Sequence, residues 1–227
     1  VAPLLITPWK TYSPPVRCEA LEALLGRADR IPALLDALEQ GTVRRGDIEI
    51  DRRQQLTQHR DPAIRQRAKE LLGSATSSDR GKVIAAYRGA LDASVSPERG
   101  KEVFKKHCMT CHRSGGEGNE VGPDLRTVQE RTPDQLLEQI LDPNREINPA
   151  YINYALATTD GRILTGIIAG ESATSVTLKR AEGATDTILR TVIDEMISTG
   201  ISLMPEGLEK DITPAQLADV IAYIRKR

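Results

Sequence analysis

Apolar residues recur every three or four positions from Val16 to Leu91, a spacing that places them on one face of each of several helices. Glycine and proline residues interrupt the pattern at intervals, so the helices are expected to be short. The run from Leu56 to Leu72 predicts a helix end, a turn at Asp61-Pro62 and a second helix. The same periodicity, with Thr-Pro starts in two cases, predicts further helices over 98–107, 132–141 and 213–226.

The period changes from helical to alternating between Tyr151 and Thr191. Ile152, Tyr154 and Leu156 alternate with other residues, and Asp160-Gly161 supplies a hairpin turn. Further alternating runs at 175–180 and 185–190 indicate a second pair of strands. A small antiparallel sheet is therefore expected to interrupt the second helical part of the chain.

These patterns predict a mainly α chain in three parts. Residues 1–15 hold four prolines without any period, which favours an extended arm or linker. Residues 16–93 form a helical segment. Residues 94–227 form a second helical domain with a β insert at about 151–191.

Composition and charge limit the classes of function that the protein is expected to have. The chain has 227 residues and a net charge of −1, which gives no sign of nucleic-acid binding. It contains no run of 18 apolar residues, so no transmembrane segment is expected. It starts at Val1 without a signal peptide, and we expect a processed protein or a piece of a longer one.

The sequence Cys108-Met109-Thr110-Cys111-His112 has the spacing of a c-type haem attachment site. Each thiol can add to one porphyrin vinyl group, and the adjacent histidine can then reach the iron. The alternative, a zinc site, needs a second pair of ligands. The remaining candidates for such a pair are Cys18, His59 and His107, and they do not form one. We therefore expect one covalent haem c.

Covalent haem attachment takes place outside the cytoplasm. The motif thus predicts an exported protein, located in the periplasm or an equivalent extracytoplasmic compartment. Cys18 remains after two cysteines are assigned to haem, and its apolar surroundings predict a buried, inert thiol. The alternative is an intermolecular disulfide.

Candidate iron ligands are His112 on one side of the haem and Met204 on the other. The ring nitrogen of His112 that does not bind iron needs an acceptor, and the carbonyl of Pro123 is the natural candidate because proline fixes that turn. Met204 lies in a loop rich in Gly and Pro, whereas Met109 is enclosed in the attachment loop and Met196 lies in a β-branched run. His/Met coordination raises the reduction potential.

Nothing in the sequence suggests catalysis, since it lacks a nucleophile elbow, a phosphate loop and an HExxH motif. An electron-transfer protein is expected rather than an enzyme in its own right. Three alternatives stay open. The haem could bind or sense small ligands through a labile sixth position, serve a peroxidase, or act as a structural element in a protein-binding scaffold.

The order of motifs resembles that of small monohaem cytochromes c: a helix with Gly100 and Phe104, the CxxCH, a Gly-Pro turn, the Met204-Pro205 loop and a last helix with Tyr223. This resemblance implies that the first and last helices cross, with Gly100 and Phe104 against Tyr223, and that the Pro123 carbonyl accepts from His112. The strand insert departs from compact members of that family.

A closer resemblance is to the haem-binding domain at the C-terminus of large exported planctomycete and verrucomicrobial proteins. The segments that carry it are RGKEVFKKHCMTCH, GNEVGPDL, LDPNREINPAYINY, DGRILTGIIAGE and SLMPEGLEKDIT. The run LTQHRDPAIRQRAKELL also resembles half of a HEAT-type repeat, a helix pair that stacks in arrays. The resemblance implies a redox partner protein, a dehydrogenase or another domain of a longer parent chain.

Overall fold

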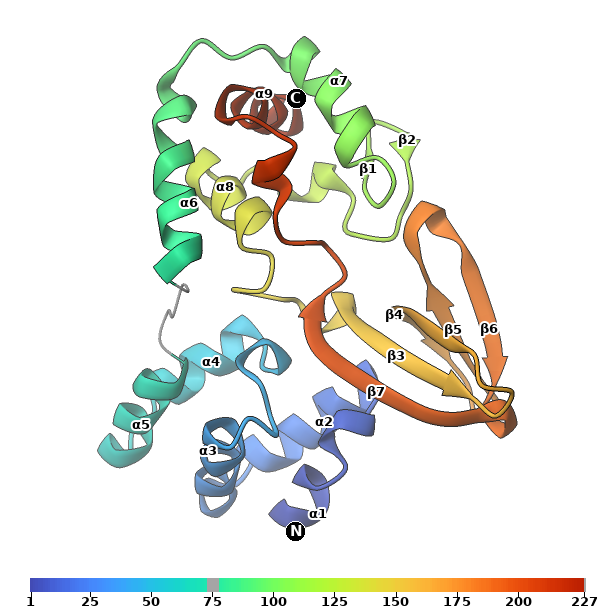
Figure 1. Cartoon of the computed structure of the whole chain (residues 1–227). Coiled ribbons are helices and arrows are strands. Elements are labelled where there is room, and N and C mark those ends of the chain that lie inside the picture. Colours follow the sequence, from blue (N-terminus) through green and yellow to red (C-terminus); the bar gives the residue numbers. More distant parts are fainter. Residues whose placement is uncertain (73–77, 227) are drawn as a thin grey trace. The chain divides into compact units, whose positions relative to one another are not determined.

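The computed structural model of the protein describes residues 1–72 and 78–226 (Figure 1). The described chain divides into two compact units, which are treated separately below. Unit 1 comprises residues 1–72, 146–178 and 186–203, and unit 2 comprises 78–145, 179–185 and 204–226. Of the described helices, none is both long and apolar enough to cross a membrane.

Unit 1 begins with short helices whose first turns contain proline. Its helical elements are α1 (Ala2–Ile6), η1 (Trp9–Thr11), α2 (Pro14–Leu25), η2 (Ala28–Arg30), α3 (Ile31–Glu39), η3 (Arg45–Asp47), α4 (Ile50–Thr57) and α5 (Pro62–Leu72). The prediction of an extended arm over 1–15 is wrong. Pro3 and Pro14 lie in the first turns of α1 and α2, where a helix tolerates proline because the missing N–H would have no partner.

The thiol of Cys18 is exposed on α2, so the prediction that it is buried is also wrong. The buried residues of α2 are Arg17, Ala20, Leu21, Leu24 and Leu25. Cys18 lies one position beyond the edge of that stripe, and its local apolar surroundings in the sequence did not reveal the side on which it falls.

The sheet of unit 1 has five strands in the order β6-β5-β4-β3-β7. They are β3 (Ile152–Thr158), β4 (Ile163–Glu171), β5 (Ser175–Lys179), β6 (Thr185–Leu189) and β7 (Ile193–Ser202), with η8 (Arg190–Val192) before the last. The sheet is thus longer than the predicted insert, which ended at about residue 191. β7 was missed because two register shifts against β3 break its alternation.

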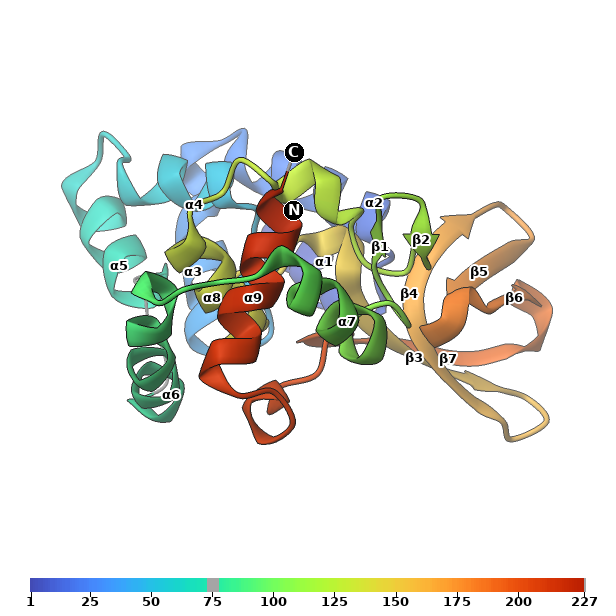
Figure 2. The ribbon, with the colours of Figure 1, turned by 90° about the horizontal axis from the view of Figure 1, so that it is seen from above.

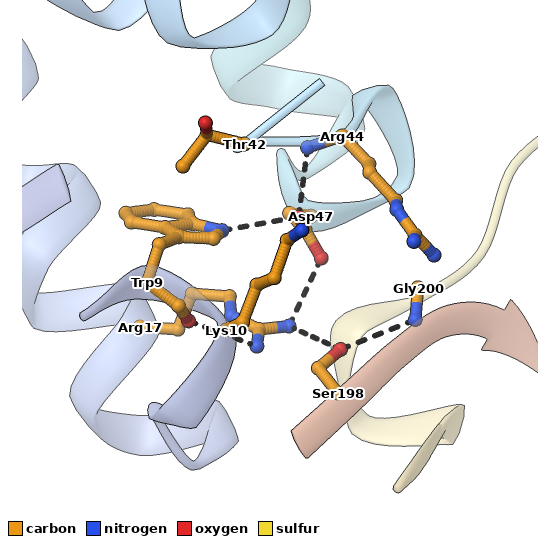
Figure 3. Close-up of a pocket in the computed structure, with 8 residues that line it drawn as sticks. All are labelled: Trp9, Lys10, Arg17, Thr42, Arg44, Asp47, Ser198 and Gly200. Atoms are coloured by element: carbon orange, nitrogen blue, oxygen red, sulfur yellow. Dashed lines mark hydrogen bonds and ion pairs between the residues drawn. The ribbon is translucent and has the colours of Figure 1, made fainter. Parts of the chain in front are cut away.

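A buried ion pair joins the sheet of unit 1 to its N-terminal helices (Figure 3). Arg17 donates to the carboxylate of Asp47 at 2.9 Å and to the hydroxyl of Ser198 on β7 at 3.1 Å. The indole Nε1 of Trp9 donates to the same carboxylate at 3.0 Å. Arg17 also donates to the carbonyl oxygen of Trp9 at 3.3 Å, so its partners come from three separate segments of unit 1.

Unit 2 is built mainly from helices. Its elements are α6 (Ser78–Arg88), η4 (Gly89–Asp92), α7 (Pro97–His107), β1 (Arg113–Ser114), β2 (Glu117–Gly118), η5 (Leu125–Val128), α8 (Pro133–Leu141), η9 (Leu208–Lys210) and α9 (Pro214–Arg225). Unit 2 also contains η7 (Ala181–Gly183), between β5 and β6, whereas η6 (Pro149–Tyr151), just before β3, belongs to unit 1. The mainly α prediction thus holds, although the sheet is larger than expected.

The division into units differs from the boundary expected at residues 93 and 94. α6, expected in the first helical segment, packs in the core of unit 2, where Ile84 and Tyr87 are buried with Phe104. The hydroxyl of Tyr87 donates to the carbonyl oxygen of Ile212 at 2.7 Å. The apolar face of α6 is thus covered by helices that follow it in the chain rather than by those before it.

α7 and α9 lie against each other within unit 2 (Figure 2). Gly100 faces α9 so closely that a Cβ built on it would be 2.0 Å from the carbonyl oxygen of Asp219 and 3.0 Å from the Cβ of Tyr223. One turn later, the ring of Phe104 lies 5.4 Å from that of Tyr223, centroid to centroid. This is the crossing that the resemblance implied, and it positions the C-terminus of α7, from which the CxxCH motif follows.

Candidate haem-binding site

The CxxCH motif forms a tight turn at the C-terminus of α7. The amide of Cys108 donates to the carbonyl of Phe104 at 2.8 Å, which continues the helical hydrogen bonding into the motif. The amides of Cys111 and His112 then both donate to the carbonyl of Cys108, at 3.1 and 2.9 Å. The two cysteines and the histidine are therefore held on one short turn whose start is fixed by the buried Phe104.

The segment that follows the motif folds back and fixes the turn from the other side. The amides of Val121 and Gly122 donate to the carbonyl of Cys111 at 3.0 and 2.8 Å, and the amide of Asn119 donates to that of Met109 at 3.2 Å. Gly118, at φ 97°, passes so close that a Cβ there would be 2.2 Å from the carbonyl oxygen of His112. Only glycine fits this position without strain.

The imidazole of His112 is held in a defined orientation by Pro123. Its Nδ1 lies 3.0 Å from the carbonyl oxygen of Pro123. Because a carbonyl can only accept, Nδ1 carries the proton and Nε2 keeps its lone pair. Nε2 makes no hydrogen bond with any residue in the described part of the chain.

Gly122 forms the surface on which this ring lies. A Cβ at residue 122 would be 2.4 Å from Cε1 of His112 and 2.8 Å from Nδ1. Burial lowers the pKa of His112, although the hydrogen bond with Pro123 opposes the shift, so the ring is neutral at physiological pH. A neutral, half-buried imidazole with a free Nε2 is the form that binds a metal.

The two cysteines of the motif are free thiols in half-buried positions. Burial, with a smaller contribution from Cys111, raises the pKa of Cys108 to about 12, and burial also raises the pKa of Cys111. Among the described residues, no three His, Cys, Asp or Glu side chains are grouped so as to hold a metal ion. The two cysteine sulfurs and the His112 nitrogen therefore do not converge on one point, as a metal ion bound by all three would require. A porphyrin instead binds the sulfurs at its periphery and the nitrogen at its iron. The residues present therefore fit haem.

Met204 lies in unit 2, as His112 does, and it is half-buried. It lies two residues after the end of β7 and precedes Gly207, whose φ of 96° turns the chain into η9. Met109 packs against the core of unit 2, and Met196 packs in unit 1 against Tyr154 and Leu156. The described structure thus leaves Met204 as the methionine of unit 2 outside the attachment turn.

The remaining histidines are placed differently. Nδ1 of His59 accepts from the amide of Asp61 at 3.1 Å in unit 1. His107 is the last residue of α7, directly before Cys108. Glu206, close to Met204, accepts a hydrogen bond from Asn144 at 2.6 Å.

Sequence reasoning missed two groups of residues around the motif. Asn119 donates through its side chain to the carbonyl of Thr110 at 3.2 Å. Residues 179–185, from the end of the β5–β6 hairpin, belong to unit 2 and contact the same turn. No local signal marks either group, because both bond to a backbone carbonyl of the motif, and a backbone carbonyl leaves no trace in the sequence.

Comparison with known families agrees with this chemistry. Residues 97–160 match the family model described as cytochrome c. The matched segment begins at α7, includes the CxxCH turn and Pro123, and ends after β3. It supports a cytochrome c-type haem-binding domain, and such a domain implies covalently bound haem c and a haem-based electron-transfer role. A comparison with curated proteins gives no match.

Proposed function

We propose that the protein is an exported c-type cytochrome that carries single electrons through one covalently bound haem. Cys108 and Cys111 would hold the porphyrin as thioethers, and His112 would bind the iron through Nε2. The observation that carries this proposal is the orientation of His112, whose Nδ1–H is held by the Pro123 carbonyl while Nε2 is left free beside two free thiols.

Haem supplies reversible one-electron chemistry at its iron, and the protein supplies ligation and a site of low polarity. The chain fixes the ligand ring before haem arrives, since Gly122 and Pro123 hold the imidazole from two sides. A ligand fixed in this way changes little between oxidation states. This favours electron transfer, because little reorganisation accompanies the change of charge.

Met204 is proposed as the second axial ligand. A thioether stabilises ferrous iron more than a second nitrogen donor does and so raises the reduction potential. With both axial positions filled, the iron has no open site for a small ligand. The ferrous protein should therefore not bind carbon monoxide in the absence of denaturant, and binding would favour the ligand-sensing alternative.

The remaining assignments follow from the resemblance. We propose that the helices α2 to α5 of unit 1 are a HEAT-like element that helps to bind a partner. A dehydrogenase, as a separate protein or as part of a longer parent chain, would supply the electrons. Electron transfer from a purified dehydrogenase that is weakened by substitution of exposed residues of α4 and α5, in protein that keeps its haem, would support this role.

A further inference from the structure

The tip of the β5–β6 hairpin, residues 179–185, contacts the CxxCH turn directly. The backbone N–H of Glu182 donates to the carbonyl oxygen of Thr110 at 2.9 Å. Lys179 donates through Nζ to the carbonyl oxygen of Glu120 at 2.6 Å. The tip is thus bonded both to the residue between the two cysteines and to the segment that folds back beneath them.

The backbone of the tip is adapted to this contact. Glu182 has φ 63° and is the one non-glycine residue with positive φ in the described part of the chain. This conformation costs energy for any residue with a Cβ, and such strain persists where surrounding contacts require it. The hydrogen bond to Thr110 is made by this same residue, so the strained conformation is the one that aims its N–H at the turn.

Gly183, the next residue, allows the close approach of Asn119. It has φ 75°, and a Cβ on it would be 3.2 Å from Oδ1 of Asn119. Asn119 in turn donates to the carbonyl of Thr110 at 3.2 Å. The Thr110 carbonyl therefore accepts from two segments, both of which the sequence places outside the CxxCH motif.

Thr110 lies between the two cysteines that would attach the haem. Thr110 is adjacent to Cys111 and two residues from Cys108, and both cysteine sulfurs would bind the porphyrin periphery. A group bonded to Thr110 is therefore next to the attached edge of the haem. We propose that the tip of the β5–β6 hairpin is part of the haem site, where it holds the attachment turn, and with it the ligand ring of His112, through Thr110.

This inference rests on the proposed function, because it gives the hairpin tip a role toward the haem. The attachment turn carries His112, and the orientation of this ligand is one of the features that set the reduction potential. A tip that holds the turn therefore affects the potential through the position of His112. Glu182 is a positioning residue in this account, since its backbone acts on the haem through Thr110.

Two substitutions of Glu182 distinguish the role of its backbone N–H from that of its side chain. Both E182G and E182P remove the carboxylate. Glycine keeps the N–H and adopts positive φ freely, whereas proline has no N–H and fixes φ near −65°. We expect E182G to have the same reduction potential and the same Cys111 amide resonance as the unmodified protein. E182P is expected to change the potential relative to E182G and to shift that resonance, because the Thr110 carbonyl loses one of its two donors.

Amide hydrogen exchange in the unmodified haem-containing protein completes the test. The amide of Glu182 should be protected from exchange, because it donates to the Thr110 carbonyl at 2.9 Å. Exchange of this amide at the rate of an unstructured peptide, together with equal potentials for E182G and E182P, would overturn the inference while leaving a haem protein. Protein without covalent haem would instead contradict the proposed function itself.

Discussion

Gly100 and Asp219 approach so closely that a Cβ on Gly100 would lie 2.0 Å from the Asp219 carbonyl oxygen. Contact at that distance involves backbone on both sides, so no side-chain rotation can relieve it. The close crossing of α7 and α9 therefore depends on the absence of a side chain at residue 100. This crossing fixes the helix end from which the haem motif begins.

Replacing Gly100 with alanine should destabilise unit 2. Alanine is the better helix former by about 1 kcal/mol, but forcing the helices apart costs more, and we expect a net loss of about 2 kcal/mol or more in the free energy of unfolding. Urea denaturation measures this change. Gly89→Ala is the matched control, since no atom lies within 4 Å of a Cβ there and its φ is not positive. Equal stability of the two variants would contradict the close crossing.

Replacing Gly122 with alanine should disturb the haem ligand while sparing the fold. A Cβ at residue 122 would be 2.4 Å from Cε1 of His112, so the imidazole must tilt away from the Pro123 carbonyl. We expect an altered Soret band and a changed reduction potential, measured by redox titration. Gly170→Ala is the control, because nothing lies within 4 Å of that site. An unchanged spectrum in Gly122→Ala would show that His112 does not bind iron in this orientation.

Met204→Ala should lower the reduction potential, because a weaker ligand such as water would replace the thioether. The variant should also bind carbon monoxide when reduced, which the unmodified protein should not. Met196→Ala, in the sheet of unit 1, is the control and should change neither property. A Met204→Ala protein with the original potential and spectrum would rule out Met204 as a ligand.

Asp219 gives the stability of unit 2 a defined dependence on pH. Burial by itself raises the pKa of this carboxyl, but hydrogen bonds from Arg99 and from the backbone N–H of Ser96 outweigh burial and hold its pKa below the usual value. The folded pKa is depressed, so the stabilising contribution is complete above the unfolded pKa of about 3.9 and is lost as the pH falls through the folded pKa.

Asp219→Asn should therefore destabilise the protein at neutral pH by about 1–3 kcal/mol and should flatten the loss of stability on acidification below about pH 4. Thermal unfolding followed from neutral to acidic pH measures both effects. Asp92→Asn serves as the control, because Asp92 is exposed. The same pH profile in Asp219→Asn and the unmodified protein would contradict the assignment.

Thiol titration distinguishes covalent haem from a non-covalent complex. The sequence has three cysteines, and two of them would be thioethers, so denatured protein carrying haem should show one free thiol. That thiol is Cys18, which is exposed and should also react in the folded protein. In haem-free protein Cys108 should react slowly at neutral pH, since burial raises its pKa to about 12. Three reactive thiols in denatured haem-containing protein would contradict the thioether bonds.

Local signals in the sequence were sufficient for most of unit 2. Thr132-Pro133 and Thr213-Pro214 mark helix starts, and the structure contains a capping box at both positions. The Pro123 carbonyl lies next to His112 as expected, because the segment after the motif folds back onto it. In these cases, the residues that determine the structure belong to the same local segment of the chain.

The errors concern relationships between distant residues. Prolines in 1–15 suggested an extended arm, but Trp9 is buried because Asp47 and the side chain of Arg17 complete its surroundings. The strands were expected with the haem domain, yet Ser198 and Tyr154 bond to the N-terminal segment. No periodicity within a strand reveals which other segment covers it. The contact of Glu182 with Thr110 was missed for the same reason.

Covalent haem on Cys108 and Cys111 is the central claim, and an absorption spectrum tests it most directly. Protein made in a host that matures c-type cytochromes should be recorded oxidised and reduced, before and after acid–acetone extraction. We expect haem that resists extraction, sharp low-spin bands on reduction, and the weak far-red band of an iron–methionine bond on oxidation. Protein that carries no haem after extraction would contradict the account.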